Sequence, residues 1–166
     1  MRRRCFVMNV FIEIEQSGLS TWIRESPSIF AYPIIIFLHT VGLGLLVGTS
    51  AVIDLRVLGA GTGIALAPLK RLFPLFYLGF WISAASGVLL WLADAHTWGV
   101  DIVFYIKMVL IVFGMWSVRV VRSRVLNHPL AAKNVVAPNG KLFAAASLGL
   151  WIGAITAGRL TAYIGK

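Results

Sequence analysis

The sequence is poor in charged residues, and acidic ones are the scarcest. Only 13% of its 166 residues are charged, with 6 acidic side chains against 15 lysines and arginines, whereas soluble domains carry about 25% charge. Hydrophobic residues make up 59%, and the mean hydropathy is +0.88. This composition excludes an ordinary soluble domain and indicates a protein of the lipid bilayer. The net charge of +9 therefore bears on membrane topology, and we expect no nucleic acid partner.

Cysteine and histidine are also scarce. The one cysteine, Cys5, has no intramolecular disulfide partner and no metal-ligand pattern around it. The three histidines, His39, His96 and His128, are far apart in the sequence. The apolar runs contain neither a nucleophile beside a base nor paired carboxylates for acid-base work. We therefore expect no stand-alone enzyme.

Long apolar runs dominate what is present. They lie at about residues 29–55, 72–93, 102–121 and 142–164, and each approaches or exceeds the ~20 residues that cross ~30 Å of hydrocarbon. The runs are continuous rather than alternating with period two. This favours helices, which satisfy their own backbone hydrogen bonds in lipid. The sequence predicts an all-α, polytopic four-helix transmembrane bundle, with one domain at 19–166 and a tail at 1–18.

A short amphipathic segment, "SGLSTWIRESPSIF", precedes the first run. Leu19, Trp22 and Ile23 share one helical face, whereas Ser20 lies on the polar face and can cap the helix start. Pro27 is expected to end the helix. The pattern predicts a short helix in the outer interface of the membrane. The tail before it lacks a signal-peptide cleavage site, so we expect it to remain attached.

Basic residues mark two of the three connections between runs. They are Arg56, Lys70 and Arg71 in one connection, and Arg119, Arg122, Arg124, Lys133 and Lys141 in the other. The third connection, "DAHTWGVD", has no lysine or arginine. The positive-inside rule then predicts that the basic loops face the cytoplasm and that both termini lie on the outer side of the membrane. The arginines of "MRRRC" oppose this orientation but are outweighed, and a start at Met8 would remove them.

Small residues four apart predict close helix packing. Gly44 and Gly48 have this spacing in the first run, and Gly149 and Gly153 have it in the fourth. The first and fourth helices are therefore expected to contact each other, or one of them forms the seam of a homodimer. Gly87 ends a similar stripe in the second run.

Ionisable residues within the runs are the candidates for chemistry. His39, Lys107 and Arg159 fall in the outer half of the predicted bundle, because successive helices alternate in direction. One imidazole and two cations would attract an anion such as a haem propionate, a quinone oxygen or a small carboxylate. Histidine is a common axial ligand of haem, which makes haem b the cofactor candidate. Met108, or a second His39 across a dimer, is the candidate second ligand.

Two other interpretations stay open at this point. His39 together with Met108 and Met115 offers donors for copper or another metal. Alternatively, these polar groups only fix helix packing. The protein would then be a scaffold or accessory subunit of a larger membrane complex, without chemistry of its own.

The end of the first run carries a separate pair of charges. Asp54 and Arg56 are two residues apart and therefore lie on different helix faces. We expect structural roles for both, and for Asp54 we favour this role over a place on a proton path. Asp54 is expected to pair with Arg119, Arg71 or Lys70 as a clamp at the cytoplasmic boundary.

Four stretches carry a family resemblance: "LHTVGLGLLVGTSAVIDLRVLG", "GFWISAASGVLLWLADA", "FYIKMVLI" and "WIGAITAGRLTAYIG". In them the chain resembles a family of small bacterial four-helix membrane proteins of undetermined activity. The matching residues are His39, Asp54, Arg56, Gly87, Lys107 and Arg159. The resemblance implies the four-helix fold but gives these residues no role. The first stretch is more distantly similar to copper-resistance membrane proteins and membrane b-type cytochromes, although the paired buried histidines of the cytochromes are missing.

Overall fold

The computed structural model describes residues 12–13, 16–25 and 31–164. This part of the chain is helical and contains no strand. Four of its helices are long and apolar enough to cross a membrane, at Tyr32–Leu58, Ala67–Ala93, Ile102–Leu126 and Gly140–Leu160. The prediction of an all-α bundle with four membrane-spanning helices is therefore confirmed.

The four long helices have clear chemical boundaries. They are α3 (Tyr32–Leu58), α4 (Phe73–Ala93), α6 (Ile102–Val121) and α7 (Gly140–Ile164). α3 begins beside Pro33, which needs no backbone hydrogen bond at that position. It ends at Gly59, whose φ of 117° lies in the left-handed region that glycine adopts without strain.

Shorter helical segments connect or flank the long ones. They are α2 (Gly18–Glu25), η1 (Ala67–Leu72), α5 (Ala95–Val100), η2 (Arg122–Leu126) and η3 (Pro129–Lys133). η1 leads directly into α4, and η2 continues α6 as a π-helical turn. Asp101 begins α6 as its N-cap, since its side chain accepts a hydrogen bond of 2.9 Å from Val103 N.

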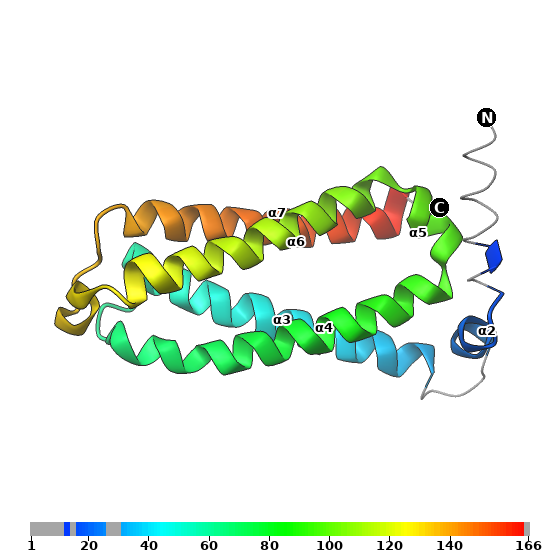
Figure 1. Ribbon diagram of the computed structural model, residues 1–166, viewed down its shortest axis with the longest axis horizontal. Helices are drawn as coiled ribbons and strands as arrows, with labels where there is room; N and C mark the ends of the chain where they lie inside the picture. The colour runs from blue at the N-terminus through cyan, green and yellow to red at the C-terminus, as the bar shows by residue number, and fades with distance from the viewer. Residues whose placement is uncertain (1–11, 14–15, 26–30, 165–166) are drawn as a thin grey trace.

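The long helices form two antiparallel hairpins, α3 with α4 and α6 with α7 (Figure 1). The hairpins meet mainly where α3 packs along α7. The predicted contact between the first and fourth helices is therefore present. We call the end of the bundle that holds α2, α5 and the last turn of α7 the tail end. The opposite end, with the α3–α4 and α6–α7 connections, is the loop end.

The α3–α4 hairpin is held by direct backbone contact at two glycines. A Cβ on Gly42 would lie only 2.6 Å from Ser83 N, and one on Gly79 would lie 2.6 Å from Leu46 N. Side chains at these positions are therefore sterically excluded, and the two helix backbones approach more closely than larger residues permit. Among the small residues of the first two runs, Gly42 and Gly79 make the tightest approach.

The glycines singled out from their spacing behave differently. Gly44, Gly48 and Gly149 are exposed and would have nothing within 4 Å of an added Cβ. Gly153 makes only ordinary contact, with Leu110 Cδ1 3.5 Å from its virtual Cβ. These glycines therefore do not form the close contacts within the bundle, and their alternative role in the seam of a homodimer stays a prediction. Spacing of four identifies a stripe of small residues but does not show which side of the helix meets its neighbour.

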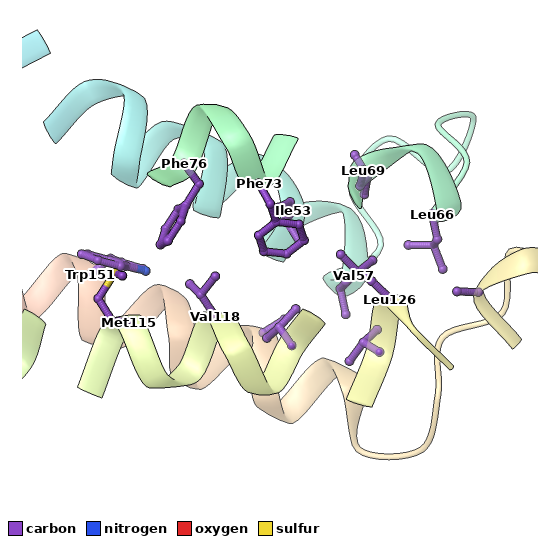
Figure 2. Packing of buried hydrophobic residues seen from close by; sticks show 14 of the residues in the cluster. Ile53, Val57, Leu66, Leu69, Phe73, Phe76, Met115, Val118, Leu126 and Trp151 are labelled. Carbon is purple, nitrogen blue, oxygen red and sulfur yellow. The ribbon is translucent and has the colours of Figure 1, made fainter. Parts of the chain in front are cut away.

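The main apolar core fills the loop-end half of the bundle (Figure 2). Phe73 and Phe76 of α4 point toward α6, where Met115 and Val118 lie. Trp151 of α7 belongs to the same cluster. The Trp151 ring lies against Gly114, where an added Cβ would be 3.2 Å from its Cε2 atom. Burial of these large side chains holds the two hairpins together in this half.

Polar contacts fasten the connections at the loop end. The Arg56 guanidinium is buried and donates to the carbonyls of Ile64 and Thr62 in the loop that follows α3. Leu66 N donates a 2.9 Å hydrogen bond to Asn134 Oδ1 in the other connection. The two loops are therefore joined directly to each other.

At the tail end, α2 packs against α3 and α4. Ile23 is 1% exposed and clusters with Ile35 and Ala93, while Trp22 is 53% exposed. Ser20 was expected on the polar face, but it is buried and donates a 2.7 Å hydrogen bond to Leu92 O. A hydroxyl that reaches a free carbonyl near a helix end is satisfied inside the protein, which explains the difference. The expected end at Pro27 lies outside the described residues.

Replacing Gly42 with alanine is expected to destabilise the bundle by about 1–3 kcal/mol, because the added methyl group meets backbone atoms that cannot move aside. Gly44→Ala is the matched control, since it makes the same chemical change two residues away in open space. Unfolding in mixed micelles of mild and denaturing detergent measures both. Equal stability of the two variants would contradict the close crossing.

Candidate functional site

His39 is the centre of the candidate site, which lies in the tail-end half of the bundle. The residue is half-buried on α3, about 10 Å along the helix axis from its start. Its Nδ1 atom lies 3.0 Å from Ser83 O and 3.2 Å from Ser86 Oγ, both on α4. The imidazole therefore bridges the two helices of the first hairpin.

The hydrogen-bond partners determine which ring nitrogen carries the proton. Ser83 offers a carbonyl oxygen, which can only accept. The Ser86 hydroxyl donates its own hydrogen to Ile82 O at 2.6 Å, so it also faces the imidazole as an acceptor. We assign the proton to Nδ1 from this network. In a neutral ring, Nε2 then keeps a lone pair for a ligand or a hydrogen-bond donor.

Gly87 lets the ring lie close to the α4 backbone. A Cβ at this position would be 3.1 Å from His39 Cε1 and 3.5 Å from Nδ1. An added methyl group would require the imidazole to shift by a few tenths of an ångström, and a long side chain would require a larger displacement. Gly87 therefore has a positioning role toward His39, which the small-residue stripe indicated only as packing.

Lys107 approaches the same region from the second hairpin. It is half-buried on α6, and its aliphatic stem lies against Gly158 of α7. A Cβ on Gly158 would be 3.5 Å from Lys107 Cε and 3.8 Å from Nζ. The ammonium group is near enough to His39 for the two to interact electrostatically. The structure thus brings together an imidazole and an ammonium group from different hairpins.

In the described chain, none of the other residues predicted for this site shares the hydrogen bonds of His39. Arg159 is exposed, and Met108 is 40% exposed on α6. The side chain of His96 lies outside the described residues. His128 is at the loop end, where its ring accepts a hydrogen bond from Leu130 N. In the described part of the chain no group of three or more His, Cys, Asp or Glu residues could hold a metal ion.

Asp54 and Arg56 have partners that differ from those expected. Asp54 is 1% exposed and accepts a 3.2 Å hydrogen bond from Ser50 Oγ, one turn earlier on α3. The cations expected to pair with it, Arg119, Arg71 and Lys70, are exposed. Burial behind the loop-end core keeps these long side chains away from the carboxylate. Arg56 is structural, because it binds the loop after α3.

Serines are the functional residues that sequence reasoning missed. Ser83 and Ser86 position His39, and Ser50 binds Asp54. Ser147 of α7 also lies beside the Asp54 carboxylate. Only the spacing of four between Ser50 and Asp54 could have been found in the sequence, since such residues share a helix face. The other contacts join different helices and required the packing to be known.

Gly87→Leu is expected to displace the imidazole from Ser83 and to cost about 1–3 kcal/mol of stability through overpacking. The control is Gly149→Leu, because Gly149 is open to its surroundings. Nitrogen NMR of the labelled histidines would detect loss of the ordered Nδ1–H signal, assigned with a His39→Gln variant. An unchanged His39 signal in Gly87→Leu would refute the positioning role.

Comparison of the chain with known protein families, with curated proteins and with solved structures gives no match.

Proposed function

We propose that the protein is a cofactor-binding redox subunit of the bacterial inner membrane, with a quinone or haem b held beside His39. The observation that carries this proposal is the orientation of the imidazole. Nδ1 is engaged by two acceptors of α4, which leaves Nε2 as the free ligand atom. Histidines that bind a metal commonly donate their other ring N–H to a carbonyl in this way.

Lys107 supports the proposal because its chemistry complements that of His39. An ammonium group donates hydrogen bonds and neutralises negative charge, whereas Nε2 accepts or ligates. The pair could bind the oxygen of a quinone through Lys107 and the hydroxyl of a quinol through His39. For haem, the same lysine could bind a propionate.

The described residues favour the quinone over haem. A quinone carbonyl needs a donor, and the hydroxyl of the quinol needs an acceptor; Lys107 and Nε2 of His39 are groups of these two kinds. Six-coordinate haem needs a second axial ligand, and the candidate Met108 is exposed on α6. That ligand would have to come from another copy of His39 or from a partner subunit. The exposed Met108 also weakens the copper interpretation.

A scaffold or accessory subunit is the second candidate. Gly44 and Gly48 favour it, because these exposed glycines offer a small-residue face of α3 to another helix. They would suit a homodimer or a larger membrane complex. In this case His39 only strengthens the α3–α4 hairpin.

The charge distribution supports an orientation with the loop end in the cytoplasm. The exposed basic residues of the loop end are Lys70, Arg71, Arg119, Arg122, Arg124, Lys133 and Lys141. The tail end instead has Asp94 and Asp101 beside α5. Positive loops are retained in the cytoplasm, so α2 would lie on the periplasmic side.

The cofactor proposal predicts that the protein purified in mild detergent carries a quinone, detected by extraction and absorbance, or a haem, detected by a reduced-minus-oxidised spectrum. His39→Ala is expected to lose the cofactor, because the ligand atom is removed. His128→Ala is the control, since His128 is exposed at the loop end. A cofactor-free wild-type protein whose His39→Ala variant folds normally would favour the scaffold.

The orientation predicts which engineered cysteines react in intact cells. In a Cys5→Ser background, Thr97→Cys on α5 should react with a membrane-impermeant maleimide. Lys133→Cys in η3 should react only after the cells are opened. The reverse pattern would overturn the proposed topology.

A further inference from the structure

A second polar cluster lies in the seam between α3 and α7, in the loop-end half. Its members are Asp54 and Ser50 of α3 and Ser147 of α7. Their exposures are 1%, 1% and 0%. The cluster is separated from His39 by 15 positions of α3, or ~22 Å along the helix axis. It does not belong to the site described above.

The carboxyl of Asp54 has no basic partner in the described chain. Arg56 follows on the same helix, but its guanidinium is occupied by the carbonyls of Ile64 and Thr62. α4 has no charged residue at all. The other cations of the loop-end helices are all exposed: Lys70 and Arg71 of η1, Arg119 of α6, Arg122 and Arg124 of η2, Lys133 of η3, and Lys141 of α7. The remaining charged groups of these helices, Lys107 and Arg159, lie toward the tail end.

Apolar side chains separate the carboxyl from solvent. Val57, Leu66 and Leu126 are each 0% exposed and lie at the loop end of the core (Figure 2). Ile53, next to Asp54 on α3, is 2% exposed. An ionised carboxylate without a counterion in such surroundings costs several kcal/mol, so charge neutrality needs a proton or a bound cation.

The two serines are arranged to hold a neutral carboxyl group. Ser50 Oγ donates to Asp54 Oδ2. Ser147 Oγ is buried beside the carboxyl and makes no hydrogen bond of ordinary geometry in the described chain. A protonated carboxyl has one O–H to donate and Ser147 can accept it, which would satisfy both buried groups.

We propose that Asp54 binds an exchangeable proton, with Ser50 as donor to the carboxyl and Ser147 as acceptor of its O–H. Binding forms the bond between the proton and a carboxylate oxygen, and release returns the proton to the aqueous phase. Asp54 is four residues from the end of α3, so the distance to the loop-end surface is only ~6 Å along the helix axis. The site stands on residues other than His39 and does not depend on the proposed cofactor.

Infrared spectroscopy of the protein in lipid vesicles at neutral pH tests the proposal. The wild type should show the carbonyl stretch of a protonated carboxylic acid, shifted in D₂O and lost in Asp54→Asn. Asp94→Asn is the control and should keep the band, because Asp94 is only half-buried beside α5. A wild type without this band, or a band that survives in Asp54→Asn, would overturn the proposal.

Ser147→Ala supplies a second measurement if Asp54→Asn does not fold. Loss of the acceptor should move the carbonyl band to higher frequency, whereas a merely structural serine would leave it unchanged. An unmoved band in Ser147→Ala counts against the assigned geometry. Stabilisation of the wild type by sodium chloride but not by choline chloride, together with absence of the band, would instead identify Asp54 as an ionised sodium ligand.

Discussion

The close contact of Gly42 with α4 is the constraint on which the candidate site depends. With backbone atoms touching at Gly42 and Gly79, the relative depth and rotation of α3 and α4 are restricted. His39 lies one turn from Gly42 toward the tail end, and Ser83 lies one turn from Gly79 in the same direction. Their contact follows from the crossing rather than from any attraction between imidazole and carbonyl. A hydrogen bond of this kind adds only about 1 kcal/mol, too little to arrange two transmembrane helices.

Different kinds of interaction stabilise the two halves of the bundle. In the loop-end half, large side chains such as Phe76 and Trp151 pack against each other in an apolar core. In the tail-end half, small and hydroxyl-bearing residues allow close approach and hydrogen bonds between helices. Apolar packing resists opening over a wide area, whereas a few short-range contacts are lost once helices move slightly apart. The half with His39 is therefore the more suitable one for admitting a ligand.

The sequence was sufficient for the fold class because bilayer thickness dictates the length of an apolar helix. The four spans and the pairing of α3 with α7 were predicted correctly in outline. The side of each helix that meets its neighbours was not predicted. Gly42 and Gly44 are both glycines in the same helix, but they point in directions about 200° apart around the helix axis. Only the packing of the helices decides which of the two is buried. The partners of Asp54 were missed for the same reason: exposed cations near a helix end were expected to be counterions, whereas the carboxyl lies beside Ser50 of its own helix and Ser147 of α7.

The hydrogen bond from Leu66 N to Asn134 Oδ1 has a mechanical consequence. It links the connection of one hairpin to that of the other, beside an apolar core that already resists separation. Relative motion of the two hairpins would therefore be a hinge motion about the joined loops. The largest displacement would occur at the tail end. His39 and Lys107 lie on separate arms in that distant half. Their separation is thus the distance most sensitive to such motion, and small adjustments at the joined loops would change it by a larger amount.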